Sequence, residues 1–272
     1  MTIRKLYPGG RPKAFSISYD DGVLQDIRFV QLLNKYGLKG TFNLNSGLMR
    51  SQFTWTHDSG LDISRLSLSA AQELYSGHEV ASHTLTHPYM ESLSRGDILM
   101  QLTTDRMNLE ALFDRQILGF AVPFLYYSDE IAACARQAGF VYARISETTN
   151  DFSVPSDPYH WRGSKFHWDE DLEDFVRGFL DTDQELALCQ LVGHSYDLDV
   201  LDLWDRMERI LQLVASSPDV AAMTNLDLVR YTSAMSKADI CDDRIANPTS
   251  MDLWFRAGER VILLHPGESQ YL

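Results

Sequence analysis

The segment Ala14-Phe15-Ser16-Ile17-Ser18-Tyr19-Asp20-Asp21-Gly22 joins a β-strand pattern to an acidic loop. From Phe15 to Tyr19, large apolar and small polar side chains alternate, as they do on the two faces of a strand. After Gly22, apolar residues recur at helical spacing as far as Gly37. The stretch therefore predicts a strand, an acidic loop and a helix in succession.

The same succession recurs along the rest of the chain. Strands are predicted at residues 40–45, 78–81, 119–123, 139–144, 185–192 and 219–223, and helices at 69–77, 94–113, 128–137, 172–179, 201–214 and 226–235. Long irregular loops are predicted at 46–66 and 146–165. Because parallel strands need crossover connections, we predict an α/β fold, a (β/α) barrel of about seven parallel strands.

The end of the chain has a different pattern. Residues 251–255 and 260–264 are strand-like and flank the turn Ala257-Gly258-Glu259, which predicts a short C-terminal β-hairpin. We therefore expect residues 1–237 to form the barrel, and residues 238–272 to form an extension whose hairpin packs on it.

Composition narrows the range of partners. The chain has 272 residues, 44% of them hydrophobic, which is typical of a globular protein, and a net charge of −14. That charge opposes binding to nucleic acid or to anionic membranes, so we expect neither as a partner. A signal peptide and a membrane-spanning segment are not recognisable, which predicts a cytoplasmic protein. Three scattered cysteines, Cys134, Cys189 and Cys241, suit reduced thiols, and oligomeric state is not indicated.

Residues suited to metal chemistry follow the predicted strands. They are Asp20-Asp21, His83 with His87, Pro123-Phe124 and His194. In a parallel barrel the loops after the strands open on one face, so we expect these residues to converge there. One carboxylate and two imidazoles form a three-ligand set that leaves a position on zinc for water. The second carboxylate is then available as a base, and histidine titrates in the range required of an acid.

These motifs resemble those of the polysaccharide deacetylases of the NodB-homology type, carbohydrate esterase family 4. Ser18-Tyr19-Asp20-Asp21-Gly22 is similar to the first motif of that family, and Ser82 to His87 is similar to the second. Ala121-Val122-Pro123-Phe124 resembles part of the third, and Val192-Gly193-His194 the last. The resemblance spans about residues 14–235 and implies a distorted barrel.

The resemblance also implies roles for individual residues. Asp20 would be the general base, and a divalent metal, zinc first with Co²⁺, Ni²⁺ or Fe²⁺ as alternatives, would bind Asp21, His83 and His87. The backbone N–H of Phe124 would hold the oxyanion, and His194 would protonate the departing amine. We therefore predict a metal-dependent carbohydrate N-deacetylase, in which a metal-bound water removes an acetyl group from an N-acetylated sugar or oligosaccharide.

Two parts of the family pattern are missing. The third motif commonly begins with an arginine that orients the base, but this chain has Ala121 there, and Arg144 is our candidate replacement. The fourth motif, an aspartate for the acid histidine and a tryptophan for the pocket, has no clear match. Its candidates are Trp161, His167, Trp168, Asp197 and Asp199. For substrate binding we expect Pro123, Tyr126, Trp161 and Trp168.

Structural and rival functional explanations remain for the same residues. Asp20-Asp21-Gly22 also suits a helix-capping turn, His83 and His87 suit a solvated loop, and His194 suits a buried structural role. Arg144, Pro123 and the two tryptophans also have structural interpretations as ion-pair, strand-end and loop-anchor residues. The rival functions are an amidohydrolase for a small non-sugar C–N substrate and a catalytically impaired barrel that binds metal or glycan.

Overall fold

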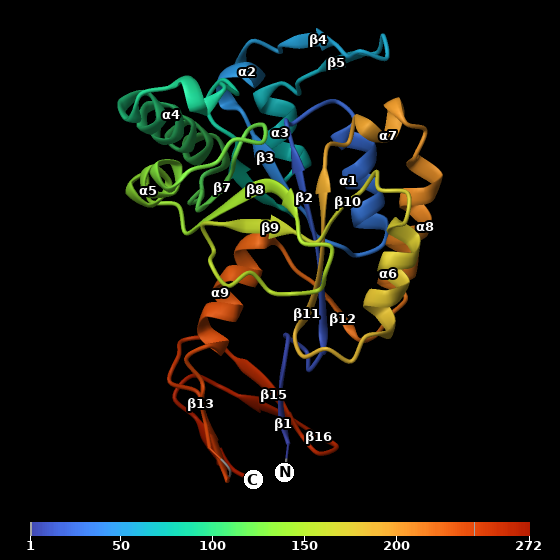
Figure 1. The fold of residues 1–272 in the computed structure, drawn as a ribbon, viewed down its shortest axis with the longest axis vertical. Coiled ribbons are helices and arrows are strands. Elements are labelled where there is room, and N and C mark those ends of the chain that lie inside the picture. Colours follow the sequence, from blue (N-terminus) through green and yellow to red (C-terminus); the bar gives the residue numbers. More distant parts are fainter. Residues whose placement is uncertain (1, 242) are drawn as a thin grey trace.

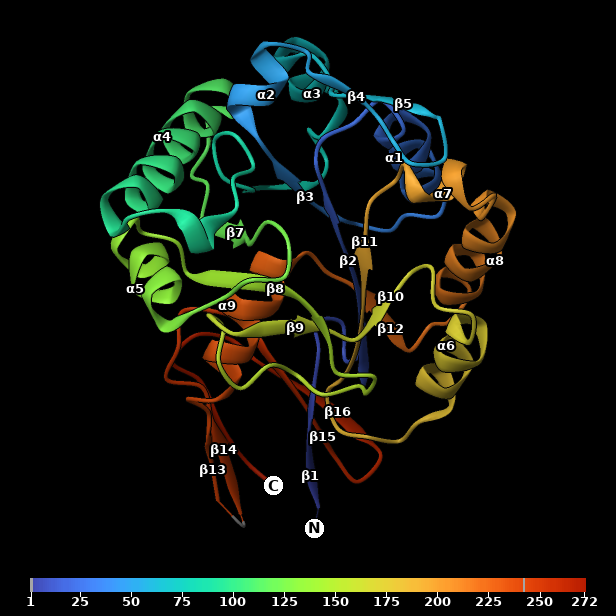
Figure 2. The ribbon, with the colours of Figure 1, turned by 45° about the horizontal axis from the view of Figure 1, so that its top comes forward.

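The computed structural model describes residues 2–241 and 243–272. Its main body is a sheet of parallel strands that curls into a barrel, with helices on the outside (Figures 1 and 2). The strands follow the order β10 (Lys165–Phe166), β11 (Ala187–Gly193), β2 (Lys13–Asp20), β3 (Thr41–Leu44), β6 (Glu79–Ser82), β7 (Gly119–Ala121), β8 (Tyr142–Thr148) and β9 (Trp161–Gly163). A short strand, β12 (Val220–Ala222), pairs with the start of β2.

The barrel closes through β9 and β10, which are separated only by Ser164. β9 pairs with β8, whereas β10 pairs with β11, so this one segment joins the two ends of the sheet. The Ser164 side chain stabilises the junction, since its hydroxyl donates to the carbonyl of Leu188 and accepts from the N–H of Gln190. Counting β9 and β10 as one, seven parallel strands make the closed ring, and the predicted distorted barrel is confirmed.

Helices surround the sheet, most of them on its outer face (Figure 2). They are α1 (Asp26–Lys35), α2 (Ser46–Arg50), α3 (Leu68–Leu74), α4 (Arg95–Phe113), α5 (Asp129–Gln137), α6 (Leu172–Asp181), α7 (Asp197–Val200), α8 (Trp204–Ala215) and α9 (Asn225–Met235), with a 3₁₀ turn at Met90–Ser92. Side-chain caps fix several beginnings, as at Ser94 for α4 and Ser128 for α5. Among the described residues, no helix combines the length and apolar character that crossing a membrane requires.

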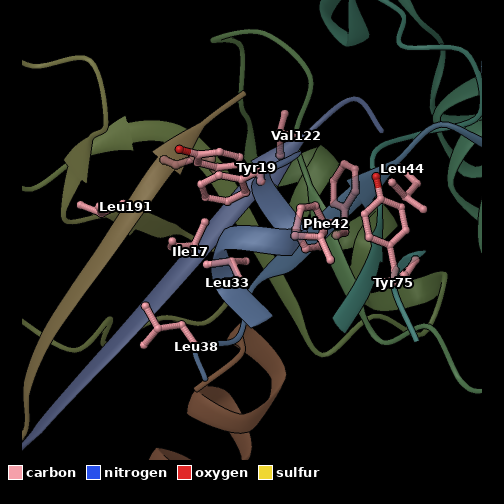
Figure 3. Packing of buried hydrophobic residues seen from close by; sticks show 14 of the residues in the cluster. Ile17, Tyr19, Leu33, Leu38, Phe42, Leu44, Tyr75, Val122 and Leu191 are labelled. Atoms are coloured by element: carbon pink, nitrogen blue, oxygen red, sulfur yellow. The ribbon is translucent and has the colours of Figure 1, made fainter. Parts of the chain in front are cut away.

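The alternating side chains of β2 lie in two different environments, an apolar core outside the barrel and a polar interior within it. Phe15, Ile17 and Tyr19 belong to the hydrophobic core under the helices, and Figure 3 shows Ile17 and Tyr19 packed within it. The Tyr19 ring stacks on Phe29 of α1, with ring centroids 4.3 Å apart. This outward face buries apolar area against α1, which is the main source of folding free energy.

The other face of β2 points into the barrel, where the side chains are polar. Ser16 hydrogen-bonds to Asn225 at 3.1 Å, and Ser18 accepts from Asn43 at 3.0 Å. Asn225 is the first residue of α9, so this helix closes the lower end of the barrel. Barrels of this general type more often fill their interior with branched aliphatic side chains. Here a hydrogen-bonded network fills it instead, and Asp20 forms its upper end.

The C-terminal segment forms small antiparallel sheets below the barrel (Figure 1). β15 (Leu253–Ala257) and β16 (Arg260–Leu264) make the hairpin that the sequence predicts. The N-terminal strand β1 (Ile3–Leu6) pairs with β15 and adds a third strand. A second sheet contains β13 (Asp239–Ile240), β14 (Arg244–Ala246) and β17 (Ser269–Tyr271). Both chain ends therefore meet in the same extension.

Two segments predicted as irregular loops contain regular structure. Residues 46–66 include α2 and a hairpin of β4 (Thr54–Thr56) and β5 (Asp62–Ser64). In the segment 146–165, β8 continues to Thr148 and β9 begins at Trp161. These strands are too short to show a period in the sequence, and they form because neighbouring segments supply hydrogen-bond partners.

A buried carboxylate links three of these elements. Asp26 at the start of α1 is fully buried and accepts hydrogen bonds from Ser195, at 2.5 Å, and from Tyr75. Tyr75 follows α3, and Ser195 follows His194 in the loop after β11. Burial raises the pKa of Asp26 to about 7, well above that of an exposed aspartate.

This raised pKa predicts a pH-dependent loss of stability. An aspartate that ionises near pH 4 when unfolded but near 7 when folded favours the unfolded state as pH rises between those values. We expect wild type to lose about 2 kcal/mol of unfolding free energy relative to Asp26→Asn between pH 5.5 and 8, at 1.4 kcal/mol per pH unit. Urea unfolding of both proteins with chelator present measures this, and parallel pH profiles would contradict it.

Candidate active site

The chemically suited residues meet at the upper end of the barrel. Asp20 ends β2 and Asp21 follows it, His83 follows β6, and His194 follows β11. The loop after β6 brings His87 back beside His83, with ring centroids 4.8 Å apart. The convergence expected for loops after parallel strands is therefore present in the structure.

Asp21, His83 and His87 present ligand atoms that all lie within 4.8 Å of one another. The Nε2 atoms of His83 and His87 lie 3.9 and 3.7 Å from Asp21 Oδ1. Asp21 Oδ1 is buried, and besides an ion pair with Arg65 it accepts no hydrogen bond from the described residues. A buried carboxylate and two imidazoles at this spacing fit a divalent cation such as zinc.

The protonation of His83 suits a metal ligand. Its Nδ1 lies 2.8 Å from the carbonyl oxygen of Ala121, and because a carbonyl only accepts, the proton is on Nδ1. Nε2, which faces Asp21, is then free to donate its lone pair. Burial lowers the pKa of His83 to about 4, so the ring stays neutral at physiological pH.

Asp20 is held by partners from opposite sides of the barrel. Arg144 of β8 forms an ion pair with Oδ1, and Asn43 of β3 donates to the same oxygen at 2.7 Å. Oδ2 receives no hydrogen bond from the described residues. Burial by itself raises the pKa of Asp20, but Arg144 and His83 outweigh it and lower that pKa below its usual value. The carboxylate is therefore ionised, with one oxygen fixed and one available.

A second arginine lies on the other side of the aspartate pair. Arg65, just after β5, is buried, and its Nη1 lies 2.7 Å from Asp21 Oδ1. Its guanidinium lies over the ring of Trp55 at 5.0 Å. Burial alone would raise the pKa of Asp21, but Arg65 and the nearby histidines lower it well below its usual range.

The third histidine of the site has its own carboxylate. His194 Nδ1 lies 3.0 Å from Asp197 Oδ2, which also accepts the backbone N–H of His194 at 3.1 Å. Burial lowers the pKa of His194, but Asp197 more than compensates and raises it to about 9. Among the candidates for the fourth motif, Asp197 is therefore the one whose carboxylate contacts His194.

Aromatic rings line the site. Tyr196 stacks on His194 at 4.7 Å, and Trp168 lies parallel to the same imidazole at 6.3 Å. On the other side, the half-exposed Phe124 stacks on Tyr89 at 4.0 Å and contacts His87. The hairpin of β4 and β5 brings Trp55 to within 5.7 Å of Tyr196.

The residues expected in substrate binding have different positions. Trp168 adjoins the site, Pro123 is buried beside Phe124, and Tyr126 is 43% exposed on the following loop. Trp161 does not join them. It is only 1% exposed and packs against Tyr142 in the lower core, not with the residues at the upper end of the barrel. That prediction was wrong because the loop position assumed for Trp161 is the first residue of β9.

The loops of the site have strained backbone conformations. Asp21, Thr84, His87 and Phe124 all adopt positive φ angles of 85°, 69°, 53° and 58°. Such angles are uncommon for residues other than glycine, and they cluster where the surrounding structure must hold a side chain in a fixed direction. Here they turn ligand and neighbouring groups toward one point above β2.

Two contacts of the aspartates were not predicted from the sequence. Asn43 lies near the carboxyl end of a predicted strand, and a polar residue there beside a buried acid is a signal that could have identified it. Arg65 lies in the segment predicted as an irregular loop, and its approach to Asp21 depends on how β5 docks onto residues 22–24. The sequence around Arg65 carries no sign of that approach.

Comparison with known proteins identifies the family of this chain. Residues 8–143, half of the chain, match the family model described as polysaccharide deacetylase. A chitooligosaccharide deacetylase of Sinorhizobium fredii is 31% identical over 80 residues, which are 29% of this chain and 37% of that relative. The match thus spans little more than a third of the relative's length.

Solved structures share the fold. A Mycobacterium smegmatis protein named as a polysaccharide deacetylase has a TM-score of 0.55 at 14% identity, covering 86% of this chain and 94% of the other. A family 4 acetyl xylan esterase from Clostridium thermocellum, in complex with a cobalt ion, has a TM-score of 0.51 at 15% identity, covering 81% and 92%. With the family match over half of its length, this chain belongs to the polysaccharide deacetylase family.

Proposed function

We propose that this protein is a divalent-metal-dependent deacetylase that removes the acetyl group from an N-acetylated sugar or oligosaccharide. The observation that carries the proposal is the grouping of three ligand-type side chains beside Asp20 and His194. Metal ligands alone would suit a binding protein. A carboxylate with one free oxygen and a protonated imidazole in the same site suit hydrolysis.

Asp21, His83 and His87 are the residues that would hold the cation. A divalent metal bound there supplies Lewis-acid chemistry, which polarises an acyl carbonyl and makes water more acidic. Zinc is our first choice, and Co²⁺, Ni²⁺ and Fe²⁺ also accept this donor set. Cobalt in the Clostridium thermocellum esterase structure supports a divalent ion in this fold.

Asp20 and His194 would move the protons. Asp20 Oδ2 is the oxygen free of Arg144 and Asn43, so it can accept a proton from the attacking water. His194 donates Nδ1–H to Asp197, which leaves its Nε2–H for the departing amine. With a pKa near 9, His194 carries that proton at neutral pH. A base and an acid are thus present in their required protonation states.

The surroundings suit a neutral sugar and an oxyanion. The exposed faces of Tyr89, Phe124 and Tyr196 are flat apolar surfaces of the kind on which pyranose rings stack. The backbone N–H of Phe124, in a strained loop beside His87, is our candidate oxyanion donor. Similarity to a protein named as a chitooligosaccharide deacetylase supports our choice of an acetylated amino sugar as the substrate class.

Acetate release tests the proposed activity. We expect acetate from N-acetylated oligosaccharides, and loss of that release with chelator followed by recovery on adding Zn²⁺ or Co²⁺. O-acetylated sugars and small non-sugar amides belong in the same panel. Turnover of the amides alone would favour an amidohydrolase, and no turnover in the presence of bound metal would favour a catalytically impaired barrel.

Metal content tests the ligands without any substrate. We expect about one divalent ion per chain in wild type and only traces in His83→Ala/His87→Ala, because two of three ligands are removed. The matched control is His160→Ala/His265→Ala, which removes two histidines far from the site. Equal metal content in the two double variants, measured by elemental analysis, would rule out these ligands.

Activity variants test the base and its arginine. Asp20→Asn should retain metal yet lose about 10²- to 10⁴-fold in kcat, the usual contribution of a general base. Arg144→Ala should lose roughly tenfold or more, since Asp20 then has one fixing partner fewer. Arg209→Ala, an exposed arginine paired with Glu173, is the control and should keep its rate. A near-native rate for Asp20→Asn would demand a different base.

A further inference from the structure

Two histidines from separate segments share the Asp197 carboxylate. Oδ2 of Asp197 lies 3.0 Å from His194 Nδ1 and 3.3 Å from Nε2 of His167. His167 follows β10 and is fully buried, and its other ring nitrogen, Nδ1, contacts the hydroxyl of Tyr19. The side chains thus form a continuous chain, in the order Tyr19, His167, Asp197 and His194, that runs from the buried core to the partly exposed site.

Nε2 of His167 lies at ion-pair distance from Asp197 without an aligned hydrogen bond to the described residues, and the polar contacts of this chain fix where its protons lie. An ionised carboxylate only accepts, so Nε2 of His167 carries the proton that faces Asp197. Nδ1 is then an acceptor, and the Tyr19 hydroxyl must donate to it. Burial lowers the pKa of His167, and burial also raises that of Tyr19, so both side chains stay neutral. The Tyr19 hydroxyl therefore selects the tautomer of His167 that can hold Asp197.

The sheet has room for the His167 ring beside Tyr19. Gly193 of β11 is the register partner of Tyr19 on β2, so its missing side chain leaves a gap beside the tyrosine. The His167 ring fills that gap, and a Cβ atom added to Gly193 would lie 2.8 to 3.0 Å from three ring atoms. The rings of Tyr19 and His167 meet edge to face at 4.9 Å. Glycine directly before His194 is thus required by the histidine that approaches it.

We propose that His167, with its tautomer set by Tyr19, is a positioning residue that holds Asp197 against His194. The proposal rests on the proposed function, in which His194 is the acid. Asp197 is the first residue of the four-residue helix α7, and its side chain is 14% exposed. Without a donor at His167, the Nδ1–H and backbone N–H of His194 still contact Oδ2, but the carboxylate has more freedom to rotate toward solvent. After that rotation, His194 would keep Asp20, Asp21 and the neutral rings of Trp168 and Tyr196 as neighbours, but would lose its closest counter-charge.

The first test replaces His167 in two ways. His167→Leu removes the donor, whereas His167→Gln keeps an N–H near the position of Nε2. We expect the pKa of His194, followed by NMR of ¹³C-labelled histidine, to fall by about one pH unit or more in His167→Leu and to recover in His167→Gln. On N-acetylated oligosaccharide, kcat should fall about 10- to 100-fold in His167→Leu with little change in KM, since a misplaced acid affects the chemical step.

The second test remains informative if His167→Leu does not fold. Tyr19→Phe removes one hydroxyl and keeps the ring that stacks on Phe29. We expect a smaller fall in the His194 pKa in the same direction. Tyr7→Phe is the matched control, because it removes a buried hydroxyl that donates to Leu186, in the lower core, and should leave the His194 pKa unchanged.

The outcomes separate the two proposals. An unchanged His194 pKa in the His167 and Tyr19 variants would overturn the positioning role, whatever the activity. A lowered pKa with no acetate release, even from wild type, would uphold the positioning role and reject the deacetylase. A loss of activity in His167→Leu that His167→Gln does not restore, at unchanged pKa, would indicate a structural role only.

Discussion

The two faces of β2 impose the constraint on which the rest of the structure depends. Its outward residues must bury apolar area under α1, and its inward residues enter a barrel that is filled by hydrogen bonds. A polar interior is stable only when nearly every group has a partner, since an unpaired buried group costs free energy. Asp20 is the last inward residue of this strand, and Arg144 and Asn43 satisfy it. The network that supports the barrel therefore also orients the Asp20 carboxylate, our proposed base.

The fold and the centre of the site were predictable from the sequence for related reasons. Alternation along residues 14–20 and apolar spacing in the following helix are local patterns, and local patterns survive in any context that buries them. Asp20, Asp21, His83 and His194 all come directly after strands, so parallel strand order alone brings them to one end. His87 is also expected at this end, because a short loop links it to His83. Their proximity needed no knowledge of how distant segments dock.

The features that the sequence did not predict depend on packing between segments that are far apart in the chain. Arg65 reaches Asp21 only because the β4–β5 hairpin docks above β2, and each strand of that hairpin is too short to be recognised. Trp161 was misplaced because β9 gains its hydrogen bonds from β8, which the local sequence does not encode. Asp197 was among the candidates, but only the structure shows that its carboxylate faces both histidines. Choosing among such candidates requires the position of every neighbour.

The absence of the usual arginine at Ala121 has a consequence for how relatives are compared. Ala121 and Arg144 are register partners on the adjacent strands β7 and β8, so the arginine enters the barrel from the strand next to the one on which the family pattern leads us to expect it. A column-by-column comparison would record a missing arginine, although a guanidinium still contacts Asp20. Because neighbouring strands of a closed barrel can present side chains to the same point, equivalent groups in such folds are better sought by their position in the barrel than by their position in the sequence.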